Sequence, residues 1–228
     1  MKRFETRGGG RNLSSNKGFT LAEVLVTLGV IGVVSAMTVP TLMQNYQRKS
    51  YVTQLHKFYN ELSQALLQYQ TDRNAVSLVE AGLNSNDAIY NFFNTYFKIV
   101  NKCENSTPCM ASEYKSMSGK TIGSKLSGFL VLASGTSLTY AYDAGSKRVM
   151  GLYVDVNGPK GPNIAGRDMF AIYVYKNGLI DDISIDDGNA PLTTEQREAA
   201  FAKCDDVSGK NWYGCFGKIL NDNWEMTY

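Results

Sequence analysis

Hydrophobic residues are concentrated near the start of the chain. Residues 19–39, FTLAEVLVTLGVIGVVSAMTV, carry a single ionisable side chain, that of Glu23. At the helical rise per residue, a helix over this segment would be about 31 Å long, close to the thickness of the hydrocarbon core of a bilayer. The pattern therefore predicts one helix that can cross a membrane.

The helical pattern continues beyond Pro40 but becomes amphipathic. Apolar side chains recur at spacings of three and four, with polar residues between them, at Val52, Leu55, Tyr59, Leu62, Leu66 and Tyr69. This periodicity is typical of a helix that buries one stripe of its surface. We therefore expect one helix over residues 19–73, bent at Pro40, with a folded domain packed against its second half.

Residues 74–228 have the mixed hydrophobic and polar pattern of a globular domain, which we call the head and expect to be exported. Residues 74–85 read as a connection or a short helix, and residues 87–100 as a second helix that starts near an Asn86 cap. From residue 128 the hydrophobic period approaches two, which predicts strands over residues 128–134, 137–143, 148–156 and 168–176. The expected fold class is α+β, a long amino-terminal helix whose second half packs on an antiparallel sheet.

Composition and charge narrow the class of protein. The chain has 228 residues, of which 43% are hydrophobic and 19% charged, so it is neither a disordered chain nor a polytopic membrane protein. Residues 1–18 hold five Lys or Arg side chains against one acidic residue. The positive-inside rule places this basic leader in the cytoplasm and exports the chain beyond residue 39. The remainder of the chain is not basic, so no nucleic-acid partner is predicted.

Residues suited to catalysis are scarce. His56 is the single histidine, which nearly excludes histidine-based catalysis and a metal site built from several histidines. The sequence contains neither a P-loop nor a G-x-G-x-x-G motif. We therefore expect no enzyme, and we interpret His56 as a solvated or interfacial side chain.

The four cysteines form two pairs that are close in sequence, Cys103 with Cys109 and Cys204 with Cys215. Neither pair has the C-x-x-C spacing of a zinc or redox site. Oxidising compartments retain disulfides, so export favours bonded cysteines. Of the three possible pairings we expect Cys103–Cys109 and Cys204–Cys215, with free or cross-paired thiols as the alternative. The second bond would fix a carboxyl-terminal region that otherwise reads as irregular.

Three interpretations of the apolar segment compete. A cleaved secretory signal would use the small residues before Met37, but its apolar region should span only roughly 7–15 residues. A permanent anchor explains the length and the basic leader, and leaves Glu23 as an acid in the first helical turn. The third interpretation is a cut at the cytoplasmic edge, where residues 17–23 read KGFTLAE. This motif closely resembles that of the type IV prepilin family.

The resemblance implies the following roles. A prepilin peptidase would cut after Gly18 and methylate the new amino terminus of Phe19. Glu23 would pair with the Phe19 amine of a neighbouring subunit and set the axial register of a filament. Gly32 and Pro40 would flank a stretch that can lose helicity in the filament, the alternative being a simple kink where the chain leaves the membrane.

One loop of the head could hold a metal ion. Residues 154–168, VDVNGPKGPNIAGRD, contain the oxygen-bearing side chains Asp155, Asn157, Asn163 and Asp168, which are the ligand types that calcium prefers. The competing interpretation is conformational, since Asn and Asp cap turns while Gly and Pro set backbone angles. The further acidic cluster Asp181, Asp182, Asp186 and Asp187 is expected to be a solvated turn.

The sequence thus predicts three parts: a cleaved leader (1–18), a long helix (19–73, with 19–39 in the membrane or filament core) and a head (74–228). The resemblance implies a structural subunit of a type IV pilus or a type II secretion pseudopilus. Its partners would be the peptidase, other pilin or pseudopilin subunits and an assembly platform in the bacterial inner membrane. Its head would lie in the periplasm or outside the cell. The alternative is an exported enzyme or binding protein tethered by one anchor.

Overall fold

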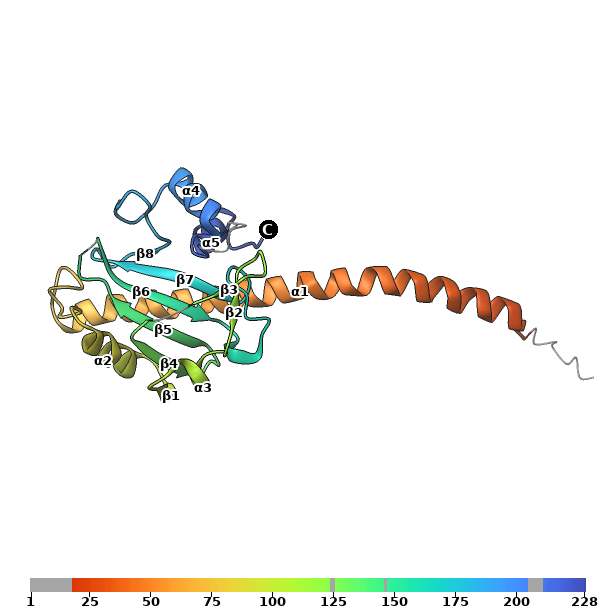
Figure 1. Ribbon diagram of the computed structural model, residues 1–228, viewed down its shortest axis with the longest axis horizontal. Helices are drawn as coiled ribbons and strands as arrows, with labels where there is room; N and C mark the ends of the chain where they lie inside the picture. Colours follow the sequence, from red (N-terminus) through yellow and green to blue (C-terminus); the bar gives the residue numbers. More distant parts are fainter. Residues whose placement is uncertain (1–17, 124–125, 146, 205–210) are drawn as a thin grey trace, which may run out of the picture. The chain divides into compact units, whose positions relative to one another are not determined.

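Figure 1 shows the computed structural model of the chain, which describes residues 18–123, 126–145, 147–204 and 211–228. Almost all of the predicted leader lies outside these residues. The chain divides into two compact units, residues 1–44 and 45–228. Helix α1 (Leu21–Asp72) contributes to both of them.

The first unit consists, in its described part, of the start of α1. Thr20 precedes the helix, and every residue from 18 to 47 is exposed. The helix is assigned without interruption through Gly32 and Pro40. The loss of helicity expected around these two residues concerns an assembled filament, and it stays a prediction.

In the second unit, α1 buries the predicted stripe. Its buried residues are Val52, Leu55, Phe58, Leu62, Ala65, Leu66 and Tyr69, all at spacings of three or four. Tyr59, expected in the same stripe, is half-buried and packs edge-on against Trp224. The helix ends at Asp72, one residue before the predicted end, and the chain turns there with Asn74 at a φ of 48°.

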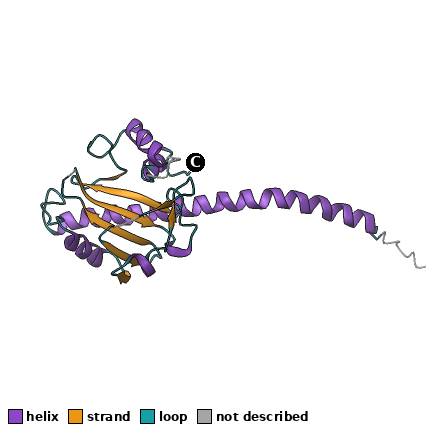
Figure 2. Ribbon diagram, in the orientation of Figure 1, coloured by secondary structure: helices purple, strands orange, loops and turns teal. Residues whose placement is uncertain are grey.

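The head contains one large antiparallel sheet, coloured orange in Figure 2. Its strand order is β1-β4-β5-β6-β7-β8, and a two-stranded sheet, β2-β3, accompanies it. The strands are β1 (Ile99–Cys103), β2 (Tyr114–Lys115), β3 (Thr121–Ile122), β4 (Gly128–Leu132), β5 (Ser137–Tyr142), β6 (Arg148–Asp155), β7 (Met169–Tyr175) and β8 (Ile180–Asp181). The four predicted strands are β4 to β7, so the predicted antiparallel sheet and the α+β architecture are confirmed.

Both faces of the large sheet are covered. On one face, apolar side chains from alternate strand positions, such as Leu152 and Ile172, join the core formed with α1. On the other face, Tyr153, Ala171 and Tyr173 pack in a second cluster with residues of β2 and β3 and with Trp212. This period-two alternation explains why the central strands were visible in the sequence.

The short helices surround the sheet. They are α2 (Asn86–Tyr96), α3 (Ser106–Cys109), η1 (Gly158–Lys160), α4 (Thr194–Cys204) and α5 (Cys215–Asn221). Three predictions were wrong here. The second helix does not reach residue 100, because residues 99–103 pair with β4, and its cap is the Ser85 side chain, which accepts from the Ala88 N–H. The carboxyl-terminal region is not irregular either, because α4 and α5 bury Ala200, Phe216 and Ile219.

Candidate functional site

The candidate processing segment comprises residues 18–23. Gly18 and Phe19 lie outside α1, and no atom comes within 4 Å of the position that a Gly18 Cβ would take. The Phe19 side chain is 88% exposed. An exposed backbone outside the helix is accessible to another protein.

Glu23 has a definite partner in the structure. Its carboxylate Oε2 accepts the backbone N–H of Thr20 at 2.8 Å and the Thr20 hydroxyl at 2.9 Å. The Glu23 N–H in turn donates to Thr20 Oγ1 at 3.2 Å. This reciprocal arrangement is a capping box, in which the side chains before and inside the first turn satisfy each other's backbone donors. Glu23 therefore organises the start of α1 while remaining exposed.

The first half of α1 offers a continuous apolar surface. Leu25, Val26, Ile31 and Val33 are each 59–65% exposed, and Met37 is 72% exposed. Helix α1 contains a window long and apolar enough to cross a membrane, judged by its length and composition, and none of that window is buried. Exposed apolar patches of this kind mark sites that meet lipid or protein.

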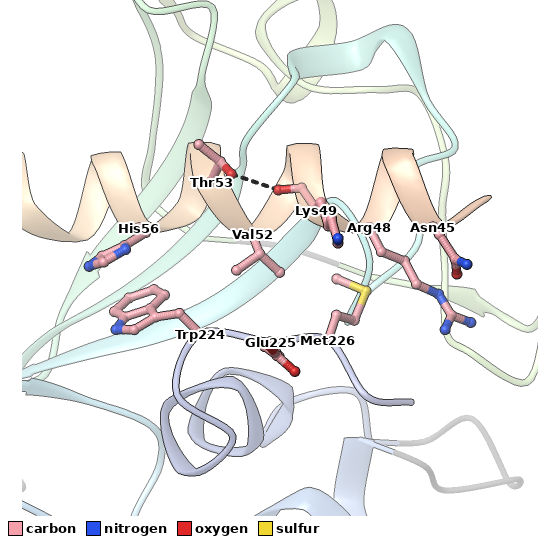
Figure 3. Close-up of a pocket in the computed structure, with 9 residues that line it drawn as sticks. All are labelled: Asn45, Arg48, Lys49, Val52, Thr53, His56, Trp224, Glu225 and Met226. Atoms are coloured by element: carbon pink, nitrogen blue, oxygen red, sulfur yellow. Dashed lines mark hydrogen bonds between the residues drawn. The ribbon is translucent and has the colours of Figure 1, made fainter. Parts of the chain in front are cut away.

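A groove runs between the second half of α1 and the carboxyl-terminal segment. It has a volume of about 590 Å³ and is lined by Asn45, Arg48, Lys49, Val52, Thr53, His56, Trp224, Glu225 and Met226. Figure 3 shows the His56 and Trp224 rings side by side at one end of the groove. The rings are stacked with centroids 3.9 Å apart and planes at 13°. His56 is thus half-buried at a packing contact, in agreement with its interpretation as an interfacial side chain.

Both expected cysteine pairs are bonded in the structure. Cys103 is joined to Cys109 with a Cα separation of 6.0 Å, and Cys204 to Cys215 with a Cα separation of 5.3 Å. The first bond connects β1 to α3, and the second connects α4 to α5. Gly166, at a φ of 84°, lies against the second disulfide, because a Cβ there would meet both sulfur atoms.

The loop after β6 is organised by its two carboxylates. Asp168 accepts the backbone N–H groups of Asn163 and Ile164, at 2.8 and 2.7 Å. Asp155 accepts the Tyr114 hydroxyl at 2.6 Å. Asp168 therefore holds the turn at Asn163 and Ile164, and Asp155 connects the end of β6 to β2. Burial raises the pKa of Asp155 to about 7, and it also raises the pKa of Asp168.

The expectation that the second acidic cluster, residues 181–187, is a solvated turn is wrong for two of its four aspartates. Asp181 and Asp182 are at most 1% exposed, so they are not part of a solvated turn, whereas Asp186 and Asp187 are exposed. Asp181 forms a bidentate ion pair with Arg197, at 2.9 and 2.7 Å.

The buried Asp182 carboxylate is compensated by backbone hydrogen bonds and not by an ion pair. Its carboxylate accepts the backbone N–H groups of Gly217 and Ile183, both at 2.6 Å. It thereby ties the start of α5 to the end of the sheet. Desolvation raises the pKa of Asp182 to about 7, and the hydrogen bonds oppose that rise.

Sequence reasoning missed two residues of these sites. Thr20 was available as a signal, because T-x-x-E before an apolar run is the sequence pattern of a capping box. The role of Tyr114 had no such signal in the sequence, because its hydroxyl donates to Asp155, which lies 41 residues away along the chain. Of the predicted site residues, the structure brings Gly18, Phe19 and Glu23 together around the first turn of α1, and Asp155, Asn157, Asn163 and Asp168 together in one loop.

These features define an α+β protein with an exposed apolar helix and an open, capped amino-terminal segment. Comparison with known proteins adds that residues 13–39 match the family model of the prokaryotic N-terminal methylation motif. Over 75 residues the chain is 32% identical to the "Prepilin peptidase-dependent protein D" of Escherichia coli (strain K12). That match covers 33% of this chain and 46% of the relative, so the chain spans about half the length of this curated relative. No solved structure matches. The resemblance of the amino-terminal segment to prepilins is confirmed.

Proposed function

We propose that this chain is a structural subunit of a type IV pilus or a type II secretion pseudopilus. In this proposal it is cleaved after Gly18, methylated on Phe19 and assembled through its hydrophobic helix. The single observation that carries the proposal is the coincidence of two features. The methylation motif over residues 13–39 falls at the start of a helix whose first half is exposed and apolar.

The local backbone supports cleavage after Gly18. The bond to be cut lies before the first turn of α1, so the peptidase does not have to unwind a helix. Gly18 has no side chain, which lets a protease approach the backbone closely. Cleavage would leave a charged amine on Phe19, next to the capping box.

The geometry around Glu23 supports a role in assembly. In the single chain its carboxylate is held by Thr20, so it is oriented but still accessible to a partner. In an apolar filament core, an amine and a carboxylate would each be costly to bury alone and much less costly as a pair. We therefore assign Glu23 to the Phe19 amine of a neighbouring subunit, which fixes the axial register of the two chains.

The first half of α1 would serve twice. Before assembly it would hold the chain in the bacterial inner membrane, with the head in the periplasm. In the filament, its apolar side chains would pack against those of other subunits, and the polymer core would replace the lipid. The activity of the protein would then be packing rather than catalysis, with other pilin or pseudopilin subunits and an inner-membrane assembly platform as partners.

Filament isolation tests the proposal. The full chain would be produced in cells that contain a prepilin peptidase and an assembly platform, and surface filaments would be sheared off and collected. We expect the chain in the filament fraction, detected by immunogold labelling along the fibres. Recovery of the chain only in the membrane fraction, with a well-folded head, would instead support a tethered exported protein.

A further inference from the structure

The segment of α1 that follows its apolar surface carries only positive charge. No acidic residue occurs between Glu23 and Glu61, whereas Arg48, Lys49 and Lys57 lie in this interval. Basic residues beside a membrane-spanning helix are normally concentrated on the cytoplasmic side, which here is the side of the leader. Membrane topology therefore does not account for a basic pair on the exported side.

The position of this pair along α1 matches the depth of phospholipid headgroups. The apolar surface of the helix extends to Leu42 and Met43, which are 69% and 52% exposed. Arg48 follows Met43 by five residues in an uninterrupted helix, which corresponds to a rise of about 7–8 Å. The headgroup region of each leaflet is roughly 5–8 Å thick. Long basic side chains at this level extend their charged ends into the headgroups while their stems cover apolar surface.

Neither basic side chain is neutralised within the described part of the chain. The ion pairs found there do not include Arg48 or Lys49. Arg148 and Arg197 are half-buried like Arg48, and each of them pairs with an aspartate. A charged group that loses part of its hydration is normally compensated by an opposite charge. Arg48 is therefore available to an anion from outside the chain.

The same two side chains line the groove between α1 and the carboxyl-terminal segment. Figure 3 shows Asn45 and Arg48 at one end of the groove, opposite to the stacked aromatic rings. Between these ends lie Val52 and Met226, which are 6% and 9% exposed. The volume of about 590 Å³ is within the range of small-molecule sites. Cations beside an apolar floor suit the phosphate and the glycerol backbone of a phospholipid.

We propose that this groove binds the headgroup of an anionic phospholipid, with Arg48 and Lys49 contacting its phosphate. Of the described residues that line the groove, only Glu225 is acidic. A phosphodiester carries one negative charge and free phosphate up to two, so Glu225 opposes the free ion more strongly. The hydroxyl groups of a glycerol headgroup can instead donate to Glu225.

The bound headgroup would act at the membrane stage of the chain. It would hold the carboxyl-terminal segment against α1, because the groove has one wall from each. Entry into a filament would then require the release of this lipid. The inference rests on the proposed anchoring of the first half of α1 in a bilayer.

Amide hydrogen exchange of the full chain in two kinds of vesicle tests the site. The vesicles would contain phosphatidylcholine alone or phosphatidylcholine mixed with phosphatidylglycerol, and flotation would establish insertion into both. We expect exchange at residues 45–56 and 224–226 to be at least about fivefold slower in the anionic vesicles, the factor expected of one basic side chain at an anionic surface. High salt should weaken the protection. Inorganic phosphate added to the neutral vesicles should not reproduce it.

Two matched double variants locate the effect. Arg48→Gln with Lys49→Gln should lose most of the protection in anionic vesicles. Lys147→Gln with Lys176→Gln removes the same charge from two exposed neighbours, since the Lys176 N–H donates to the Lys147 carbonyl. The turn after Lys176 lies against Gln70, 22 residues beyond Arg48 on α1, so this control is remote from the groove and should retain the protection.

The outcomes separate the site from the anchoring on which it rests. A chain that floats with neither kind of vesicle would overturn both. Flotation with equal exchange in the two kinds of vesicle would overturn the site alone, and so would full protection in the variant of Arg48 and Lys49. If that variant kept the protection but lost filament formation, the basic pair would meet an acidic surface of a neighbouring subunit instead of a lipid.

Discussion

The two halves of α1 have the same secondary structure and opposite surroundings. In the half that belongs to the first unit, residues 21–44, every side chain is exposed although nearly all are apolar. In the half that belongs to the second unit, seven residues are buried in a stripe, and most residues on the other sides of the helix are polar. Burying a Leu, Val or Phe side chain is worth roughly 1.5–3 kcal/mol. The second half therefore gains its stabilisation within the chain.

This difference shows what the first half lacks. Its apolar surface requires a surrounding that this chain does not provide among its described residues. A bilayer and a bundle of helices from neighbouring subunits both meet that requirement. The Glu23 carboxylate distinguishes them, because only the bundle would supply a neighbouring amine. The proposed transfer from membrane to filament follows from this comparison.

The largest expected effect is that of Glu23→Ala. Removing the carboxylate should leave cleavage after Gly18 intact, because the cut lies outside the helix, but should abolish filament formation. Sheared filaments would be quantified by immunoblot. The control is Glu61→Ala, which removes an exposed acid of the second half that is paired with Lys57 at 3.8 Å. Normal filament yield from Glu23→Ala would contradict the register role.

The next largest effect is expected from shortening a buried side chain in the second half of α1. Leu62 is 0% exposed, so Leu62→Ala should lower the free energy of unfolding of the head by about 2–5 kcal/mol. Leu67, on the same helix, is 67% exposed, and Leu67→Ala should change it by no more than about 0.5 kcal/mol. Denaturant unfolding of the full chain in detergent measures both. Equal effects would mean that the buried stripe is wrongly placed.

The pH dependence of the head should follow Asp182 together with Asp155, because burial raises the pKa of each carboxyl to about 7. The folded-state pKa of Asp182 is raised to about 7 by desolvation, whereas the unfolded carboxyl has a pKa of 3.8. The unfolded state therefore releases a proton near pH 4 that the folded state keeps until about pH 7. The free energy of unfolding should fall as the pH rises across this range, by an amount on the order of 2–4 kcal/mol.

Asp182→Asn tests this assignment. The variant should reduce the fall in stability between pH 4 and pH 8 and leave the part that Asp155 contributes, whatever its stability at a single pH. Asp186→Asn, at an exposed carboxyl of the same segment, should leave the slope unchanged. If the slope is the same in Asp182→Asn and in the wild type, another group titrates.

Removing the disulfides should lower the free energy of unfolding of the head and leave membrane anchoring unchanged. In the loop-closure view, the double change Cys204→Ser and Cys215→Ser should cost about 2–3 kcal/mol, and the same change at Cys103 and Cys109 a similar or slightly smaller amount. Peptide mapping without reduction would establish the pairing in the exported chain. Membrane anchoring should be unaffected, because the first half of α1 contains no cysteine. Cross-paired peptides would contradict the structure.

The smallest expected effect concerns the helix cap. Thr20→Val keeps the shape of the side chain but removes the hydroxyl that accepts from the Glu23 N–H. It should destabilise the first turn of α1 by about 1 kcal/mol. Faster amide exchange at residues 21–24, relative to residues 30–33 of the same helix, would reveal it. Unchanged exchange would mean that the capping box does not persist in a membrane.

The sequence predicted those elements whose periodicity is strong. The long helix and strands β4 to β7 were recognisable because their hydrophobic positions repeat at spacings that match one secondary structure. The first two residues of strand β1, Ile99 and Val100, were assigned to a helix because the aromatic run over residues 87–100 is ambiguous by periodicity, and pairing with β4 decided the outcome.

The functional residues also divide into those that could be predicted from the sequence and those that could not. The processing segment could be predicted because Gly18, Phe19 and Glu23 are adjacent in sequence. The burial of Asp182 could not, because its partner Gly217 lies 35 residues away and only the folded chain brings the two together.

The most direct measurement is the mass of the amino-terminal peptide. The full chain would be produced together with a prepilin peptidase, extracted from membranes and digested. The account predicts a peptide that begins at Phe19 and carries one methyl group on its amine. A peptide that begins at Met1 under the same conditions, with an active peptidase confirmed on another prepilin, would contradict it.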